Sequence, residues 1–484
     1  MHNTAHFFKF FTIRERGFTQ LFSPFLVNCL AFLGIIGLSV FLSVFFIFPE
    51  MPKNKFLYDA GGYYYLSLDI ENWGQFYSSI RTFGYPFFLY LVRQLAIATN
   101  TFPWLTFLFI VQFSIHTLTS FLTLGIYNHL LIKTQKQASP AWGFLIFALS
   151  QLNLVLLPFA FEILTENLSI FLFTLAIYWF TSENKHRFVF MGFALGLATL
   201  IRPFYGPLSL ICGFALVLFV LRPQNFTWSF LKRSVSPVLQ FGLPFLIICS
   251  PQIYLIHKHE NRFSLVGESA HHAGKAHLNL GQIVMKFETH GLDKAKPLIV
   301  YLDTDRQKDL LNLSIRSSPL TFFFSRFGDS MDLILHKTIA LFQNFEWSVF
   351  RTGGAPNPLH PVFIFGFVHF SFLFWILMYL LPGLKTWFQR NEGSVPVFSF
   401  VGTSLLLHLF LYSVPTVPES RYIAPVLPGL IALGCCALRN LSKPQRTIAL
   451  LLAAFTYFYT FHTLRASIQQ LDFTELYNLV TPKT

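Results

Sequence analysis

The chain has 484 residues, of which 54% are hydrophobic and only 12% are charged. A soluble domain normally carries about a quarter charged residues, so this composition excludes an ordinary water-soluble protein. The net charge of +13 would suggest nucleic acid in a soluble protein. Here Lys and Arg flank apolar runs as topology signals, and no nucleic-acid partner is expected.

Apolar runs that approach the roughly 20 residues needed to cross a bilayer recur along the chain. The first, residues 21–48, is longer than the hydrophobic part of a cleavable signal, and we interpret it as a retained helix. Together the runs predict an all-α integral membrane protein with about eleven transmembrane helices. The predicted spans are 21–48, 104–131, 141–159, 163–181, 188–201, 204–221, 237–256, 360–382, 396–414, 424–438 and 447–465.

The segment 83–98 is apolar but short, and it contains Arg93. We therefore predict a helix that lies on the membrane surface without crossing it. With this choice, and with the long stretch 257–360 left out of the count, 15 Lys and Arg fall on one side and only eight on the other, so the positive-inside rule makes the first side cytoplasmic. The N-terminus is then cytoplasmic and the C-terminus outside. Counting 83–98 as a span would move Lys133 and Lys136 outside and spoil the pattern.

This topology predicts one multi-span transmembrane domain, residues 1–465, and an extracytoplasmic tail, residues 466–484. Two large segments lie outside: residues 49–103 and the hydrophilic stretch 257–360. Residues 310–345 mix apolar and charged side chains at helical spacing. We expect interfacial helices in both outer segments and no separate folded domain.

Ionisable side chains in or near a membrane are costly and often mark functional sites. Five groups of them fall on the predicted outer side. They are Asp59; Asp69 and Glu71 with Arg81; Glu162 and Glu166; Arg202; and Glu419, Arg421 and Tyr422.

Several of these groups also have a plainer interpretation. Asp59 precedes a glycine pair that permits a close backbone approach or a sharp turn, but it is alternatively a solvated loop carboxylate. Glu71 fits a surface ion pair. Arg202, before a proline, fits a side chain that only extends to the membrane surface. Glu419 and Arg421 fit a pair with each other.

Glu162 and Glu166 are four residues apart, so one helical face would carry both. Two like charges one turn apart repel unless a cation or a hydrogen bond compensates, and burial would raise the pKa of at least one. The alternative is a helix start in the headgroup region. Taken together, the outer charges suit chemistry in which a carboxylate acts as general base and an arginine binds phosphate.

The histidines are less informative. His271, His272 and His277 cluster in the long outer segment, but no second ligand set has zinc spacing. No cofactor is expected to be required, and a divalent metal at this cluster is the alternative.

The order of these features resembles the glycosyltransferase C superfamily, in the branch of protein O-mannosyltransferases and lipid A aminoarabinose transferases. The motifs are Asp59 with a tyrosine-rich stretch after it, Arg81 before Gly84-Tyr85-Pro86, Thr165-Glu166, Arg202-Pro203, and Arg421-Tyr422 followed by Pro425 and Pro428. Two positions depart from many relatives: Ala60 stands where a second acid is common, and Phe87 where a second proline is common.

The resemblance implies an inverting glycosyltransferase that takes a sugar from a polyprenyl-phosphate donor on the extracytoplasmic side. The acceptor would be a lipid, a glycan or a protein, and the enzyme would sit among the lipids of a bacterial inner membrane. Asp59 matches the catalytic carboxylate and Asp69 a second loop acid. Arg202 and Arg421 match arginines near the donor phosphate. Further donor- or substrate-binding candidates are Arg81, Glu162, Glu166, Glu419 and Tyr422.

Two other functions compete with this one. An O-antigen polymerase or ligase would use a lipid-diphosphate donor, and the long outer segment with Arg306, Arg316 and Arg326 would suit it. A transporter or lipid flippase would be expected to show internal repeats and ionisable groups at the centre of broken helices, and the sequence displays neither.

Overall fold

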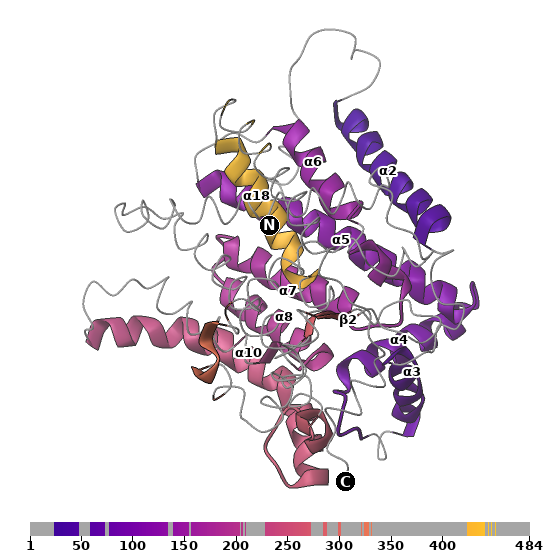
Figure 1. Cartoon of the computed structure of the whole chain (residues 1–484), viewed down its shortest axis with the longest axis vertical. Coiled ribbons are helices and arrows are strands. Elements are labelled where there is room, and N and C mark those ends of the chain that lie inside the picture. Colours follow the sequence, from indigo (N-terminus) through magenta and orange to yellow (C-terminus); the bar gives the residue numbers. More distant parts are fainter. Residues whose placement is uncertain are drawn as a thin grey trace.

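The computed structural model describes most of the first 272 residues and selected parts of the rest. The described residues are 24–47, 59–72, 77–133, 139–153, 156–203, 205–206, 209, 228–272, 284–287, 299–301, 321, 324–328, 331, 424–440, 444, 447 and 451. They are predominantly helical (Figure 1), in agreement with the predicted fold class. Within them, three helices are long and apolar enough to cross a membrane, at Leu26–Phe45, Trp104–Ile132 and Val235–Glu260.

The long helices are α2 (Pro24–Leu42), which continues as the π-helical turn η2 (Ser43–Ile47), α5 (Trp104–Lys133) and α10 (Trp228–Glu260). The last begins well before the predicted start at residue 237 and contains Pro237, Pro244 and Pro251. Internal prolines remove backbone hydrogen bonds, but neighbouring groups compensate for this in membrane helices.

Shorter apolar helices pack between the long ones. They are α6 (Pro140–Gln151), α7 (Glu166–Thr181), α8 (Arg187–Ile201) and α18 (Leu427–Asn440), with the 3-10 turns η5 (Leu157–Phe161) and η8 (Ala424–Val426). α7 packs against α5 on one side and α8 on the other, and α8 packs against α10, so the four helices follow one another across the molecule (Figure 1). α7 is therefore central to the described helices.

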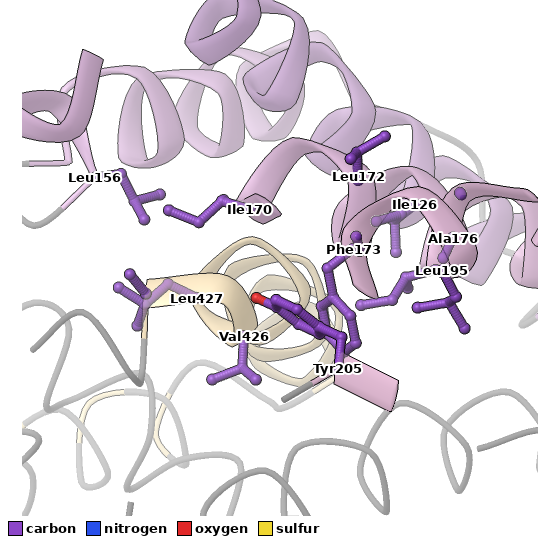
Figure 2. Packing of buried hydrophobic residues seen from close by; sticks show 14 of the residues in the cluster. Ile126, Leu156, Ile170, Leu172, Phe173, Ala176, Leu195, Tyr205, Val426 and Leu427 are labelled. Atoms are coloured by element: carbon purple, nitrogen blue, oxygen red, sulfur yellow. The ribbon is translucent and has the colours of Figure 1, made fainter. Parts of the chain in front are cut away.

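The main apolar core lies around α7. Figure 2 shows Phe173 of α7 beside Tyr205, next to the turn that carries Val426 and Leu427. The rings of Phe173 and Tyr205 are 5.5 Å apart, and all four side chains are buried. Small residues bring α8 and α10 together in the same way as in other membrane helix pairs: a Cβ at Gly192 would lie 2.1 Å from the carbonyl oxygen of Phe241.

One predicted span is not a single continuous helix. Residues 141–159 were expected to form a single helix, but α6 ends at Gln151 and η5 starts only at Leu157. The side chain of Asn153 accepts a hydrogen bond from the backbone N–H of Leu156 at 3.1 Å. Such local side-chain bonds compete with a helix. The predicted spans 360–382 and 396–414 lie outside the described residues, as do nearly all of 204–221 and 447–465.

Residues 257–360, which are predicted to lie outside, contain a strand pair that the sequence patterns did not predict. β1 (Val284–Phe287) pairs antiparallel with β2 (Ile299–Tyr301), with Phe287 opposite Ile299 and an irregularity between Val284 and Lys286. The strands are short and rich in β-branched and aromatic residues, which favour strands. Of the expected helical stretch 310–345, only a few positions are described.

In the described part of residues 49–103, the other segment predicted to lie outside, the chain forms α3 (Asp59–Asp69), the 3-10 turn η4 (Ile70–Asn72) and α4 (Gly84–Thr99). α4 confirms the helix predicted over 83–98, and at about 24 Å long it is shorter than the roughly 30 Å hydrocarbon core. Arg93 is buried in it and pairs with Glu71 at 2.5 Å. Glu71 thus forms an ion pair, but its partner is the buried Arg93 and the pair is not confined to the surface as expected; the pairing accounts for a charge inside an apolar helix.

Candidate functional site

Asp59 and Arg81 form an ion pair at the start of α3. The Oδ1 atom of Asp59 lies 2.8 Å from Nη2 of Arg81, and the two side chains are 45% and 20% exposed. Asp59 is the first residue of the helix, where the helix dipole stabilises a carboxylate. The carboxylate is therefore held by a partner and a helix end, and it is not the freely solvated loop residue that was the alternative.

The glycine pair after Asp59 allows the side chain of Arg81 to approach the backbone of α3 closely. A Cβ added at Gly62 would lie 2.7 Å from Cζ of Arg81, so the guanidinium rests against the helix backbone where Gly62 has no side chain. The same guanidinium lies over the ring of Tyr63, 4.9 Å from its centroid. Such a cation–π contact, with the ion pair, fixes the arginine head group on two sides.

The chain before α4 holds Arg81 in place. The backbone N–H of Arg81 donates to Oγ of Ser78 at 3.0 Å, and that of Phe83 donates to Oε1 of Gln252 at 3.1 Å. Gly84 lies against the end of α8, since a Cβ there would be 2.5 Å from the carbonyl oxygen of Leu200. The Arg-x-x-Gly-Tyr-Pro motif therefore packs next to Arg202.

A second ion pair, between Glu166 and Arg202, lies deeper. Oε1 of Glu166 is 3.1 Å from Nη1 of Arg202, and the side chains are only 1% and 11% exposed. Glu166 is the first residue of α7, and Arg202 follows the last residue of α8 in an extended conformation. Oγ1 of Thr165 also donates to Glu166, at 3.2 Å. The compensating cation expected for the glutamates is thus Arg202, which is buried and paired and does not merely reach the membrane surface.

Glu162 does not share a helical face with Glu166, so this prediction is wrong. Glu162 follows η5 in an extended conformation, and α7 begins four residues later. Its backbone carbonyl accepts a hydrogen bond from Nε2 of Gln112 at 3.0 Å. Nδ2 of Asn167 donates in turn to the carbonyl of Gln112 at 2.7 Å. These bonds hold the extended residue Glu162 and the first turn of α7 against α5.

Two tyrosines lie between the ion pairs. The rings of Tyr63 and Tyr85 meet edge to face with centroids 5.2 Å apart. Burial, and then the carboxylates of Asp59 and Glu166, raise the pKa of Tyr63 to about 12. Burial, followed by Glu166, raises the pKa of Tyr85 well above its usual value. Both phenols are therefore neutral near pH 7 and can donate hydrogen bonds.

Tyr85 has an additional feature that sequence reasoning missed. Its side chain is 0% exposed, and its hydroxyl has no hydrogen-bond partner among the residues that the structure describes. A buried hydroxyl without a partner is costly. The Gly-Tyr-Pro motif marked this residue, but nothing in a linear motif indicates that its hydroxyl is buried near Tyr63 and the carboxylates of Glu166 and Glu162.

The structure does not bring Asp69 to this group. Asp69 is the last residue of α3 and is exposed, about 15 Å along the helix from Asp59. Glu419, Arg421 and Tyr422 lie outside the described residues. The η8 turn that follows them packs against α7, the helix that Glu166 begins.

The histidine cluster remains incomplete, because His277 lies outside the described residues. Within the described part of the chain, no three His, Cys, Asp or Glu side chains are placed so as to hold a metal ion.

Comparison with known proteins adds no relative: no protein-family model and no curated protein matches this chain. Its class follows from the structure itself. The described residues form a predominantly helical protein whose longest apolar helices are suited to a membrane, with two neighbouring carboxylate–arginine pairs bridged by tyrosines.

Proposed function

We propose that this protein is a membrane glycosyltransferase that moves a sugar from a polyprenyl-phosphate donor to an acceptor on the extracytoplasmic side. The observation that supports it best is the ion pair of Asp59 with Arg81, which is partly open to the surroundings. It combines the two groups that such a reaction requires, a carboxylate for the acceptor proton and a guanidinium for a phosphate.

The pair suggests an order of events. A donor phosphate competes with Asp59 for the guanidinium of Arg81, because arginine binds both anions with the same planar set of donors. Binding of the phosphate then releases the carboxylate. Asp59 accepts the proton of the acceptor hydroxyl or amine while that oxygen or nitrogen attacks C1 of the sugar.

The leaving group determines what the arginine does next. The bond between C1 and the phosphate oxygen breaks as the new bond forms on the opposite face, so the configuration at C1 inverts. The electron pair leaves with the lipid phosphate. Arg81 stabilises this developing charge, an electrostatic contribution that is often the largest in enzymes.

The second ion pair supports the first in this proposal. Arg202 is already paired with Glu166 at 3.1 Å, so its main role in this proposal is to hold the carboxylate of Glu166 in place. Arg421, Tyr422 and Glu419 are proposed to complete the donor site, because they precede η8, which packs on α7. Glu162, which precedes Glu166 by four residues, is proposed as a further polar contact for the substrate.

The proposal includes a topology. About eleven transmembrane helices would carry the chain through a bacterial inner membrane, with a cytoplasmic N-terminus and with α4 on the outer surface. Asp59, Arg81 and the long outer segment would then share the extracytoplasmic side, where lipid-linked sugars are used.

A pair of measurements tests the function. Cells that carry the wild-type protein or the Asp59→Asn variant are compared by mass spectrometry of their envelope lipids and glycans. We expect a sugar that is present with the wild type and missing with the variant, at equal protein level in the membrane. The control is Glu268→Gln, because Glu268 is an exposed carboxylate of the long outer segment. Identical glycans for wild type and Asp59→Asn would refute the role of Asp59.

Donor class is tested separately. The purified protein is titrated with undecaprenyl phosphate and with undecaprenyl diphosphate. We expect tighter binding of the monophosphate, and preference for the diphosphate would favour the polymerase or ligase alternative.

One observation favours a lipid flippase or transporter as the second candidate. The regular helix is interrupted between α6 and η5, and the side chains of Gln151 and Asn153 are buried where it is interrupted. Discontinuous helices with polar groups are typical of transporters. Transfer of a fluorescent lipid between the leaflets of proteoliposomes, without any glycosyl transfer, would support this function over ours.

A further inference from the structure

The segment before Arg81 is attached to the far end of α10. The hydroxyl of Tyr77 donates a hydrogen bond to Oε1 of Glu260, 183 residues further along the chain. The ring of Tyr77 stacks on His259 with centroids 4.3 Å apart. Burial and the bond to Glu260 raise the pKa of Tyr77 to about 12. The phenol therefore stays protonated and keeps donating at physiological pH.

Glu260 also organises the turn after α10. Its two carboxylate oxygens accept the backbone N–H of Glu268, at 3.2 and 3.0 Å. A Cβ at Gly267 would lie 2.5 Å from Oε1 of Glu260 and 2.6 Å from Cα of Ser79. Only a glycine leaves room for the carboxylate and the first outer segment to meet at this position.

Ser79 completes the attachment. Its hydroxyl donates to Oγ of Ser269 at 2.8 Å, and its carbonyl accepts the N–H of Ala270 at 3.1 Å. We call the contacts of Tyr77 and Ser79 with Glu260, Gly267 and Ser269 the outer clasp. The clasp joins the two outer segments next to the charged site.

The route from the clasp to the site is short. Ser78, between the two clasp residues, accepts the N–H of Arg81 at 3.0 Å. Phe83, two residues beyond Arg81, donates to Gln252 on the same helix α10. The peptide that presents Arg81 is thus fixed to α10 at both ends, and Glu260 holds the first of these attachments.

We propose that Glu260 is a positioning residue, which sets the guanidinium of Arg81 against Asp59 through the outer clasp. The proposal rests on the proposed function where it concerns phosphate binding. Glu260 does not itself lie in the ion pair. Its carboxylate orders Tyr77 and the 267–270 turn, and these order the peptide of Arg81.

The first test uses substitution and a defined probe. Glu260→Ala removes both acceptor oxygens, whereas Glu260→Gln keeps one oxygen that can accept from Tyr77 and from the N–H of Glu268. For Glu260→Ala we expect the dissociation constant for undecaprenyl phosphate to rise by roughly tenfold, with Glu260→Gln close to the wild type. Arg262→Ala is the matched control, because Arg262 is an exposed neighbour that pairs only at the surface with Glu268.

The second test restores the clasp by other means. In a variant without the five natural cysteines, Ser79→Cys and Ser269→Cys place two thiols where the serine hydroxyls now touch. Oxidation to a disulfide should return tight binding to the Glu260→Ala protein, and reduction should remove it again. If the disulfide does not return tight binding to the Glu260→Ala protein, and the melting temperature is unchanged, a positioning role is overturned.

A third measurement does not depend on the function. Hydrogen exchange of the peptide 77–83 should accelerate in Glu260→Ala and slow again in its oxidised double-cysteine form. If the wild type binds neither lipid phosphate but the exchange responds as described, the proposed function fails and the clasp stands. Unchanged exchange in Glu260→Ala would refute the clasp itself.

Discussion

The guanidinium of Arg81 rests on the backbone of α3 at Gly62, and this contact leaves it 2.8 Å from the carboxylate of Asp59. The missing side chain is what allows the approach. A substitution at Gly62 should therefore disturb the ion pair while leaving the rest of the fold intact.

We expect Gly62→Ala to displace Arg81 while changing stability little. The added methyl group would lie 2.7 Å from Cζ of Arg81, and this neighbour is the end of a flexible side chain that can move away. Undecaprenyl phosphate binding should weaken by roughly tenfold at a melting temperature near that of the wild type. Gly34→Ala is the control, because nothing lies within 4 Å of a Cβ there. Equal binding by both variants would contradict the contact.

The two aspartates of residues 49–103 should differ in effect. We expect Asp59→Asn to lower turnover by at least about a hundredfold, the scale on which a general base contributes. Asp69→Asn should stay within about twofold of the wild type, because Asp69 is exposed at the other end of α3. Once the donor is known, turnover of both variants under single-turnover conditions checks this. A large loss of turnover in Asp69→Asn would show that Asp69 belongs to the site after all.

The pair of Glu166 and Arg202 should be important for stability. Removing one partner leaves the other charge buried, which typically costs about 3–5 kcal/mol. We expect Glu166→Ala and Arg202→Ala each to lower the melting temperature in detergent strongly, and the double variant to lower it by less than the sum. Additive losses would show that the two side chains, 3.1 Å apart, are not coupled.

Tyr85→Phe should change the affinity for the lipid phosphate without lowering the stability of the fold. The hydroxyl of Tyr85 has no partner within the described part of the chain, so removing it should leave stability unchanged or slightly raised. If a bound donor supplies the missing acceptor, the same variant should bind undecaprenyl phosphate several times more weakly. Thermal unfolding with and without the lipid measures both quantities. Wild-type binding would mean that the hydroxyl faces no ligand.

The position of α4 can be tested by labelling single cysteines from outside. If α4 lies on the surface, Ile80→Cys and Thr101→Cys, which flank it and are both exposed, react with an impermeant maleimide in intact cells. Lys185→Cys, between α7 and α8, should react only after the cells are opened. Opposite sidedness of residues 80 and 101 would show that α4 crosses the membrane.

Hydropathy alone predicted the helical membrane class and several helices closely. α8 matches the expected 188–201 and α4 the expected 83–98 to within about one residue, because apolar periodicity is a local property that neighbouring helices do not change. The break after α6 and the strand pair at 284–301 were missed. Both depend on hydrogen bonds that an average over apolar residues does not register.

The sequence by itself identified the candidate functional residues, which are acids and arginines that a membrane tolerates only at a cost. Their partners were decided by tertiary structure. Arg81 joins Asp59, Arg93 joins Glu71, Arg202 joins Glu166, and Glu260 reaches Tyr77. Ion pairs and hydrogen bonds act over a few ångströms, whereas these partners are 22 to 183 residues apart, so only the packing of the helices α3, α4, α7, α8 and α10 brings them within range.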